Sequence, residues 1–150
     1  KQTLNSPSLI IEIQGMCNEN VVVTRDRVTL RGTNPALDGI HAVSNATQTD
    51  AALWVRGAHQ VVVENLKLTG GFTGLLATEA STPSLRMVNC RSEGNAAYGV
   101  ALETSLLEAE DTVLTSNGNY NAGVFSGADV FCGIPANVSG TSNCSLYPKA

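Results

Sequence analysis

Residues 61–77 read Val-Val-Val-Glu-Asn-Leu-Lys-Leu-Thr-Gly-Gly-Phe-Thr-Gly-Leu-Leu-Ala, and the rest of the chain can be ordered around them. Two runs rich in β-branched and aliphatic residues meet at Asn65. A glycine-rich bend follows, and a third apolar run begins at Gly74. Short apolar runs bounded by Asn and Gly are typical of β-strands joined by turns. The stretch therefore predicts three short strands separated by two bends.

This arrangement recurs along the chain. The residues at the first bend lie 24 and 22 positions apart, and they are Asn65, Asn89 and Asp111. The glycines that open the third run lie 25 and 24 positions apart, and they are Gly74, Gly99 and Gly123. A fixed period of this length indicates a solenoid, in which each coil buries its apolar face against its neighbours. We expect the three corner residues to adopt the left-handed conformation, which Asn and Asp tolerate best, and to form a hydrogen-bonded ladder.

Alternation along the strands predicts which side chains fill the interior. In the strands that open with glycine, the expected inward residues are Ile40, Ala42, Leu75, Ala77, Val100, Leu102 and Val124. In the strands that follow a corner, they are Val28, Leu30, Leu66, Leu68, Cys90, Ser92, Thr112 and Leu114. The fold class is thus all-β, a parallel solenoid of about 4–5 coils with an irregular C-terminal end segment.

One domain covers residues 1–150, with an N-terminal end at 1–8, coils at 9–126 and a C-terminal cap or tail at 127–150. Asp26 and Arg27 are read as an early corner, followed by a strand at 28–32 that matches the strand after Asn65. Residues 44–50 are a polar insertion. Either 39–43, which opens with glycine, or 51–55 continues the stack in this longer coil.

Composition excludes two classes of partner. The net charge is −4, and no basic stripe is present, which argues against nucleic acid. No run of 18 apolar residues occurs, so the sequence predicts no membrane span. The chain begins at Lys1 rather than at Met, and we expect a processed product that is secreted, extracellular or periplasmic.

The four cysteines allow three pairings. Cys132 and Cys144 lie in the segment rich in Gly, Pro, Asn and Ser, where a disulfide would constrain a region with little core of its own. We predict that these two are paired and that Cys90 is a reduced, buried thiol. Cys17 sits in an expected turn near the start, and its state stays open.

Residues 61–70, the Asn65 and Asn89 corners and the glycine-opened strands at 39, 74, 99 and 123 resemble the right-handed parallel β-helix proteins of the pectin-lyase-like superfamily. The resemblance covers residues 9–126 and implies three parallel sheets. It also implies that the asparagine corner is the bend between two of the sheets. The glycine-opened strands would then belong to the sheet on which the enzymes of the superfamily bind sugar.

The catalytic residues of that superfamily have no counterparts on this expected sheet. Lyases of the superfamily carry acidic Ca²⁺ ligands and a basic residue there, and its hydrolases carry paired carboxylates. The outward positions here are His41 or Trp54, then Leu76, Ala101 and Phe125. No carboxylate lies in this column, so no catalytic role is transferred and no cofactor is expected.

Two groups of residues remain as candidate sites. The first group consists of four polar residues around the long coil, namely Asp38, His41, Arg56 and His59. A histidine beside Asp38 could act as a general base, and Arg56 could hold the carboxylate of an acidic sugar. Alternatively, these side chains could only form hydrogen bonds within turns. Two histidines without a third clustered ligand do not indicate a metal site. The second group is an apolar stripe formed by Trp54, Leu76 and Phe125. Residues 44–50 or 128–150 could cover this stripe, or it could contact another subunit or bind a ligand.

The short column and the missing carboxylates favour a secreted, non-catalytic module that binds glycan or mediates assembly. The alternative is a small or truncated carbohydrate-active enzyme, such as a polysaccharide lyase, epimerase or hydrolase, acting on an acidic polysaccharide. We also expect a homo-oligomer, because the eight residues before Leu9 make a poor cap for a solenoid end. Either the N-terminal coil or the Trp54, Leu76 and Phe125 stripe would form the contact.

Overall fold

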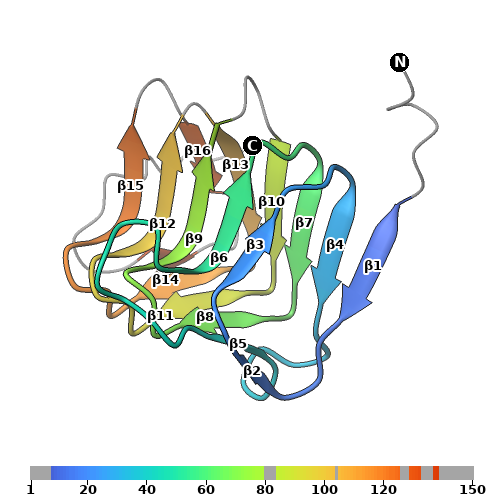
Figure 1. Cartoon of the computed structure of the whole chain (residues 1–150), viewed down its shortest axis with the longest axis horizontal. Coiled ribbons are helices and arrows are strands. Elements are labelled where there is room, and N and C mark those ends of the chain that lie inside the picture. Colours follow the sequence, from blue (N-terminus) through green and yellow to red (C-terminus); the bar gives the residue numbers. More distant parts are fainter. Residues whose placement is uncertain (1–7, 80–83, 104, 126–128, 133–136, 139–150) are drawn as a thin grey trace.

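The computed structural model describes residues 8–79, 84–103, 105–125, 129–132 and 137–138, and the side chains among them up to residue 123. The strands of the described residues form three sheets, here called A, B and C (Figure 1). Sheet A contains β1 (Leu9–Glu12), β4 (Val28–Arg31), β7 (Val61–Glu64), β10 (Ser84–Val88), β13 (Leu106–Glu110) and β16 (Asp129–Cys132). Sheet B contains β2 (Met16–Asn18), β5 (Gly39–His41), β8 (Lys67–Thr69), β11 (Arg91–Glu93), β14 (Val113–Thr115) and β17 (Asn137–Val138). Sheet C contains β3 (Val21–Val23), β6 (Ala51–Arg56), β9 (Thr73–Thr78), β12 (Tyr98–Glu103) and β15 (Tyr120–Phe125).

Each circuit of the chain contributes one strand to A, then one to B, then one to C. Neighbouring strands are parallel in all three sheets, for example Val61 beside Leu85 in A and Leu75 beside Val100 in C. The predicted all-β parallel solenoid is therefore confirmed, with about 5 turns. No helix long and apolar enough to cross a membrane occurs among the residues that the structure describes.

The interior is filled by the residues that strand alternation predicts. Leu30, Ile40, Leu68, Leu75 and Leu102 are each at most 1% exposed. The smaller predicted inward residues are buried as well, among them Cys90, Ser92 and Thr112. The side chain of Val124 lies outside the described part. Stacking of like positions from coil to coil thus produces one continuous apolar column.

The corner between sheets A and B is formed by the three residues that the sequence singles out. Asn65, Asn89 and Asp111 have φ angles of 56°, 52° and 47°. Asn89 Nδ2 donates to Asn65 Oδ1 at 2.8 Å, and Asn65 Nδ2 donates to the carbonyl of Gly32 at 3.0 Å. Because each bond joins one coil to the next, the corner holds successive coils in register.

A second asparagine ladder lies at the corner between sheets B and C, and it is missing from the predictions. Asn95 is 4% exposed, and its Nδ2 donates to Asn117 Oδ1 at 2.9 Å. Its Oδ1 accepts from the backbone N–H of Gly71 at 3.1 Å. Asn95 and Asn117 each follow the first corner by six residues, and this offset is the sequence signal that could have revealed the ladder.

This second ladder explains why the glycines at 74, 99 and 123 do not all occupy equivalent positions in successive coils. A Cβ on Gly74 would collide with Ser92 Oγ, and one on Gly99 would lie 2.6 Å from Asn117 Nδ2. In the next coil the place of Gly99 is taken by Asn121, whose Oδ1 accepts from Asn117 Nδ2 at 3.0 Å. Gly123 pairs with Ala101, so its predicted alignment with Gly99 is wrong by two residues.

The predicted layout of the first two coils is also wrong in part. Val28–Arg31 forms β4 in sheet A, where Leu30 pairs with Val63, and is not the strand after the first bend. Val21–Val23 belongs to sheet C, beside β6. Arg27 therefore marks the corner between C and A, and Gln60 is its equivalent one coil later, with φ angles of 60° and 56°.

Both candidate strands between residues 39 and 55 continue the stack, in different sheets. Ile40 pairs with Leu68 in sheet B, so the alignment of Gly39–His41 with the glycine-opened strands is wrong. Ala51–Arg56 pairs with β9 in sheet C. The cause is that this coil has long turns at 32–38 and 42–50, where the next coil needs only 65–66 and 70–72.

Asp38 holds the first of these long turns to the coil below it. Its carboxylate accepts backbone N–H bonds from Gly15 at 2.7 Å, Thr33 at 2.7 Å and Asn34 at 3.0 Å. These donors stabilise the ionised form, with the Gly15 bond contributing most, and they lower the pKa of Asp38 below its ordinary value. The carboxylate thus links coils that only short strands otherwise join.

The described cysteines are both free thiols. Cys90 is buried, as predicted, and desolvation raises the pKa of its thiol to about 11. Cys17 lies in β2 rather than in a turn, and its Sγ donates to Glu19 Oε1 at 2.8 Å. The predicted pair Cys132–Cys144 falls outside the described side chains.

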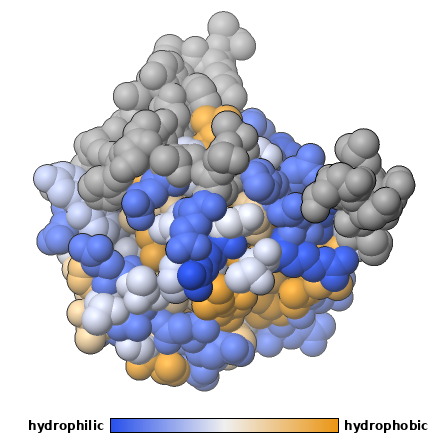
Figure 2. Space-filling view, turned by 45° about the horizontal axis from the view of Figure 1, so that its top comes forward, coloured by the Kyte–Doolittle hydropathy of each residue, from blue (hydrophilic) through white to orange (hydrophobic). Residues whose placement is uncertain are grey.

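The N-terminal coil exposes much of its apolar surface. Ile10, Ile11 and Val22 are 50%, 40% and 51% exposed, and β1, β2 and β3 each end their sheet within the described residues. Hydrophobic surface is open to solvent toward this side of the molecule in Figure 2. Edge strands with free backbone groups and apolar side chains favour association with a further strand.

The asparagine ladder between A and B is expected to contribute measurably to stability. Asn89→Gly keeps the left-handed conformation but loses the bond to Asn65, which should cost about 1 kcal/mol. Asn89→Ala also forces a residue with a Cβ into that conformation, which should add roughly 1–2 kcal/mol. Urea unfolding measures both, with Asn119→Ala, at an exposed turn, as the neutral control. Equal stability of Asn89→Gly and the parent chain would show that the ladder bond contributes nothing.

Asp38 should make stability depend on pH in the acid range. Because its folded pKa is lowered, the stabilisation is complete above the unfolded pKa of about 4 and is lost as the pH falls through the lower folded value. Asp38→Asn should lower the melting temperature at pH 7 and flatten its fall below pH 4. Thermal melts between pH 7 and pH 2 test this, with Glu12→Gln as an exposed carboxylate control. An unchanged pH profile in Asp38→Asn would contradict the assignment.

Candidate groove on the outer face of sheet C

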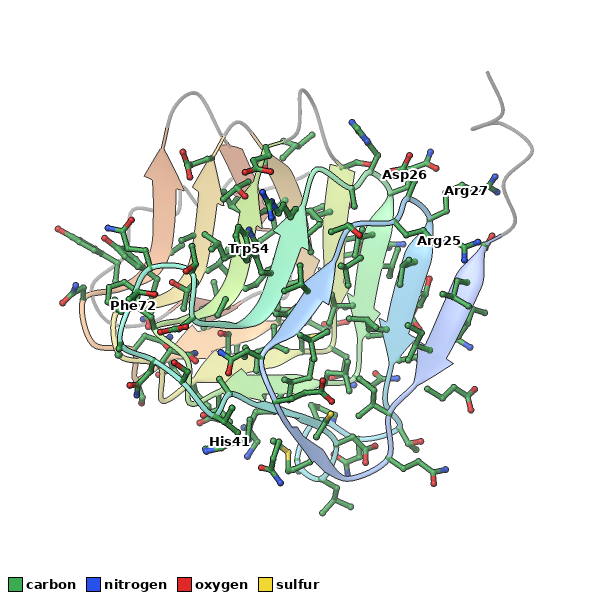
Figure 3. All side chains as sticks on the ribbon, viewed as in Figure 1. Arg25, Asp26, Arg27, His41, Trp54 and Phe72 are labelled. Atoms are coloured by element: carbon green, nitrogen blue, oxygen red, sulfur yellow. The ribbon has the colours of Figure 1, made fainter. Side chains whose placement is uncertain are left out.

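The polar insertion at 44–50 passes over the outer face of sheet C, beside strands from later coils (Figure 3). Asn20 anchors its start, since Asn20 Oδ1 accepts from the N–H groups of Val43 and Ser44, each at 3.1 Å. Asp50 closes its end by accepting from Ala46 N at 3.0 Å and Thr47 N at 2.9 Å. The Thr47 bond is the main cause of a lowered Asp50 pKa. The insertion is therefore a loop held at both ends by hydrogen bonds, and it forms one wall of a depression.

Two adjoining cavities lie between this loop and the sheet. The first has a volume of about 300 Å³, and its lining includes Gln48, Phe72, Thr73, Leu76, Tyr98 and Glu103. The second has a volume of about 490 Å³, and its lining includes Gln48, Thr49, Trp54, Leu76, Glu79 and Glu103. Because Gln48, Leu76 and Glu103 line both, the two form one depression, here called the sheet C groove.

The floor of the groove is the predicted apolar stripe, with one change of register. Trp54 pairs with Leu76, and Leu76 pairs with Ala101. Phe125 pairs with Glu103 rather than with Ala101, so its predicted place in the stripe is wrong by two residues. Although they point outward, Leu76 and Ala101 are only 8% and 5% exposed, because they pack with Ala51, Trp54 and Tyr98.

Trp54 is held in place by two neighbours, Thr78 and Arg56. Its indole Nε1 donates to Thr78 Oγ1 at 2.8 Å. The guanidinium of Arg56 lies over its ring, 5.2 Å from the centroid, and Arg56 Nε is 2.7 Å from Glu79 Oε2. The Glu79 hydrogen bond raises the pKa of Arg56. This part of the groove therefore consists of the Trp54 ring with the ion pair of Arg56 and Glu79 packed against it.

Three aromatic rings stand side by side where sheet C begins. Tyr98 and Tyr120 are stacked, with centroids 6.0 Å apart, and Phe72 and Tyr98 are tilted, with centroids 6.4 Å apart. Phe72 and Tyr98 face the first cavity. Tyr98 and Tyr120 occupy paired positions of neighbouring strands, whereas Phe72 precedes Thr73, the residue that pairs with Tyr98. The sequence predictions missed this row, because the spacings of 26 and 22 residues do not repeat a single period.

Three of the four polar residues proposed as an alternative site are bonded to different partners. Asp38 bonds backbone amides in its turn, and Arg56 is paired with Glu79. His59 Nδ1 lies 3.3 Å from Asp26 Oδ1 at the corner between C and A. His41 is exposed in sheet B, opposite the corner that carries Asp26 in Figure 3. The fold thus divides these residues among different corners and sheets.

The chemistry of the groove follows from its lining. Aromatic rings offer apolar faces, and Gln48 and Glu103 offer an amide and a carboxylate group. Small-molecule sites commonly combine an apolar lining with a few convergent polar groups. No group of three His, Cys, Asp or Glu side chains able to hold a metal ion occurs within the described ranges.

Comparison of the chain with protein family models, with curated proteins and with solved structures gives no match.

Proposed function

We propose that this chain is a secreted, non-catalytic β-helix module that binds glycan in the sheet C groove. The observation that carries the proposal is the pairing of an aromatic wall with hydrogen-bonding side chains beneath an anchored loop. Sugar rings present apolar C–H faces and a rim of hydroxyl groups, so they need both kinds of contact. A groove that runs across successive coils also suits an extended chain.

We propose in addition that the solenoid winds right-handed, like the pectin-lyase-like proteins that the sequence resembles. Crossover connections between parallel strands of one sheet are almost always right-handed. Three sheets and a corner of left-handed asparagines support this finer assignment.

The polar quartet gives little support to the alternative of an enzyme acting on acidic polysaccharide. Asp38 is occupied by backbone amides in a turn, and Arg56 is held by Glu79. A general base must come within hydrogen-bonding reach of the substrate proton that it removes. His41 lies in sheet B and Arg56 in sheet C, so the four residues do not form one cluster. The groove does hold two carboxylates that the sequence analysis did not place on this sheet, Glu79 and Glu103, but Glu79 is bonded to Arg56. We therefore favour the binding module.

Binding should depend on Trp54. Trp54→Ala should weaken glycan binding about tenfold or more, because stacking and burial of one aromatic ring contribute roughly 1–2 kcal/mol. A glycan-array screen of the full chain, followed by calorimetry on the hits, measures this. Ile11→Ala, which removes an exposed apolar side chain far from the groove, is the control. A parallel assay for unsaturated uronate tests the non-catalytic part, since sustained product release would establish an enzyme.

The same chain is proposed to form a homo-oligomer through its N-terminal coil. Ile10 and Val22 are half-exposed there, whereas Leu76 in the stripe is already covered. The exposed coil is therefore the stronger candidate of the two contacts. Burial of such side chains contributes about 1.5–3 kcal/mol each.

Ile10→Ser with Val22→Ser should convert the oligomer to monomer. Light scattering at micromolar protein measures this, with Leu37→Ser, at a 66% exposed turn residue, as the matched control. Trp54→Ser with Phe125→Ser tests the stripe in the same way. A parent chain that is monomeric throughout the range would end the assembly proposal and leave the glycan proposal untouched.

A further inference from the structure

We infer, on the basis of the glycan-binding function proposed above, that Arg56 and Glu79 form a recognition pair for two hydroxyl groups on adjacent carbons of one sugar ring. The ring that carries these hydroxyls would lie against Trp54, in the part of the sheet C groove where Trp54 and Glu79 line the same cavity. The class of ligand is therefore a glycan whose linkages leave neighbouring hydroxyls free.

The pair is held against an aromatic surface. Trp54, which is half-buried, projects from β6 and lines the groove (Figure 3). The guanidinium of Arg56 lies over its ring, with 5.2 Å between the Arg56 Cζ atom and the ring centroid. Arg56 Nε in turn donates to Glu79 Oε2 at 2.7 Å. A sugar that packs against the open part of the indole thus comes within reach of both charged groups.

Both side chains keep hydrogen-bonding atoms available to a ligand. A guanidinium carries N–H donors on Nε and on both Nη atoms, and the hydrogen bond shown for Arg56 among the described residues uses Nε alone. Glu79 accepts that bond with Oε2, and a carboxylate can accept further bonds at both of its oxygens. The two side chains are 49% and 55% exposed, so solvent reaches them. The pair therefore offers a donor and an acceptor side by side.

Two hydroxyl groups on adjacent ring carbons match this arrangement. One O–H can donate to the Glu79 carboxylate while the oxygen of its neighbour accepts from an Arg56 N–H. When the two C–O bonds are gauche, the hydroxyl oxygens lie about one hydrogen-bond length apart, similar to the 2.7 Å between Nε and Oε2. Both bonds involve a charged group, which makes them stronger than bonds between neutral groups. An isolated hydroxyl has a single oxygen for both groups, so it cannot align well with each.

The backbone of Glu79 supports a role for its carboxylate. Glu79 follows β9 with a φ of 63°, in the left-handed region where a side chain is unfavourable. Because Arg56 pairs with Thr78, the equivalent residue of the preceding coil is Gly57, whose φ is 66°. Glycine thus makes the same bend without a side chain. Strained positions of this kind gather at functional sites, and the carboxylate is what glutamate adds here.

The ion pair between Arg86 and Glu110 on sheet A lacks the aromatic ring and the left-handed glutamate. Its length is also 2.7 Å, and Arg86 is 49% exposed, as Arg56 is. Glu110, however, lies within β13, and in the described part of the chain the cavity beside Arg86 is lined by no aromatic residue. Arg86 is therefore a matched control for Arg56.

The test measures binding of uncharged hexasaccharides to the full chain by calorimetry at pH 7. In cellohexaose, xylohexaose and mannohexaose, every internal sugar keeps two adjacent free hydroxyls. Laminarihexaose is built from the same glucose as cellohexaose, but its linkages use the middle hydroxyl of each ring, so no internal sugar keeps an adjacent pair. The parent chain should bind at least one of the first three about tenfold or more tightly than laminarihexaose, since one hydrogen bond to a charged group accounts for roughly that factor.

Two variants separate recognition from stability. Arg56→Met keeps an apolar stem over Trp54 but removes the N–H donors, and it should abolish the preference over laminarihexaose. Glu79→Gly should do the same without lowering the melting temperature, because glycine adopts the left-handed backbone freely. Arg86→Met should keep both the preference and the affinities of the parent chain.

Three outcomes would overturn the assignment of Arg56 and Glu79. Equal affinity of the parent chain for laminarihexaose and the other probes, or a preference that survives in both variants, would contradict it and leave the proposed function in place. A lower melting temperature of Glu79→Gly would show that the glutamate is structural. If no hexasaccharide binds, the assignment fails, and the glycan array described above decides separately whether the chain binds any glycan.

Discussion

The stacking of one coil on the next through parallel backbone hydrogen bonds is the interaction on which this fold depends. Strands of two to six residues are too short to be stable alone, so each relies on its neighbouring strands in the sheet. Stacking succeeds only if equivalent residues of successive coils meet in register. The corners maintain this register, because Asn65 and Asn89 both turn the backbone and bond across coils.

The interior shows how such a column tolerates polar side chains. Ser92, Asn95 and Thr112 are all at most 4% exposed, yet each has a hydrogen-bond partner in its own or an adjacent coil. Within the described residues no buried side-chain nitrogen or oxygen lacks a partner. Buried polar groups are costly only when unpaired. The asparagines at the corner between B and C thus add specificity of register at little cost in stability.

The long second coil supplies the loop that forms the candidate groove. Its turn at 42–50 is not needed to close the coil, since the next coil makes the same connection with 70–72. The extra residues cross sheet C, and Gln48 lines a cavity with residues from coils three and four. A surface that would otherwise be a flat strip becomes a groove. Leu76 is itself mostly buried against Ala51, Trp54 and Tyr98, which reduces the apolar area open to a partner.

The sequence alone determined the period, the inward side chains and the corner at Asn65, Asn89 and Asp111, because these depend on local alternation and on residues that tolerate left-handed backbone. It did not determine the strand alignment of the first two coils, where Asp38 and Asp50 hold the long turns. Nor did it determine the place of Gly123, since Asn121 takes the position equivalent to Gly99 and accepts a hydrogen bond from Asn117. Trp54 and Leu76 were recognisable as a stripe. Their groove was not, because Gln48 and Glu103 come together only after the insertion crosses two further coils. Which strands lie beside an insertion is a property of the folded stack, and no local pattern encodes it.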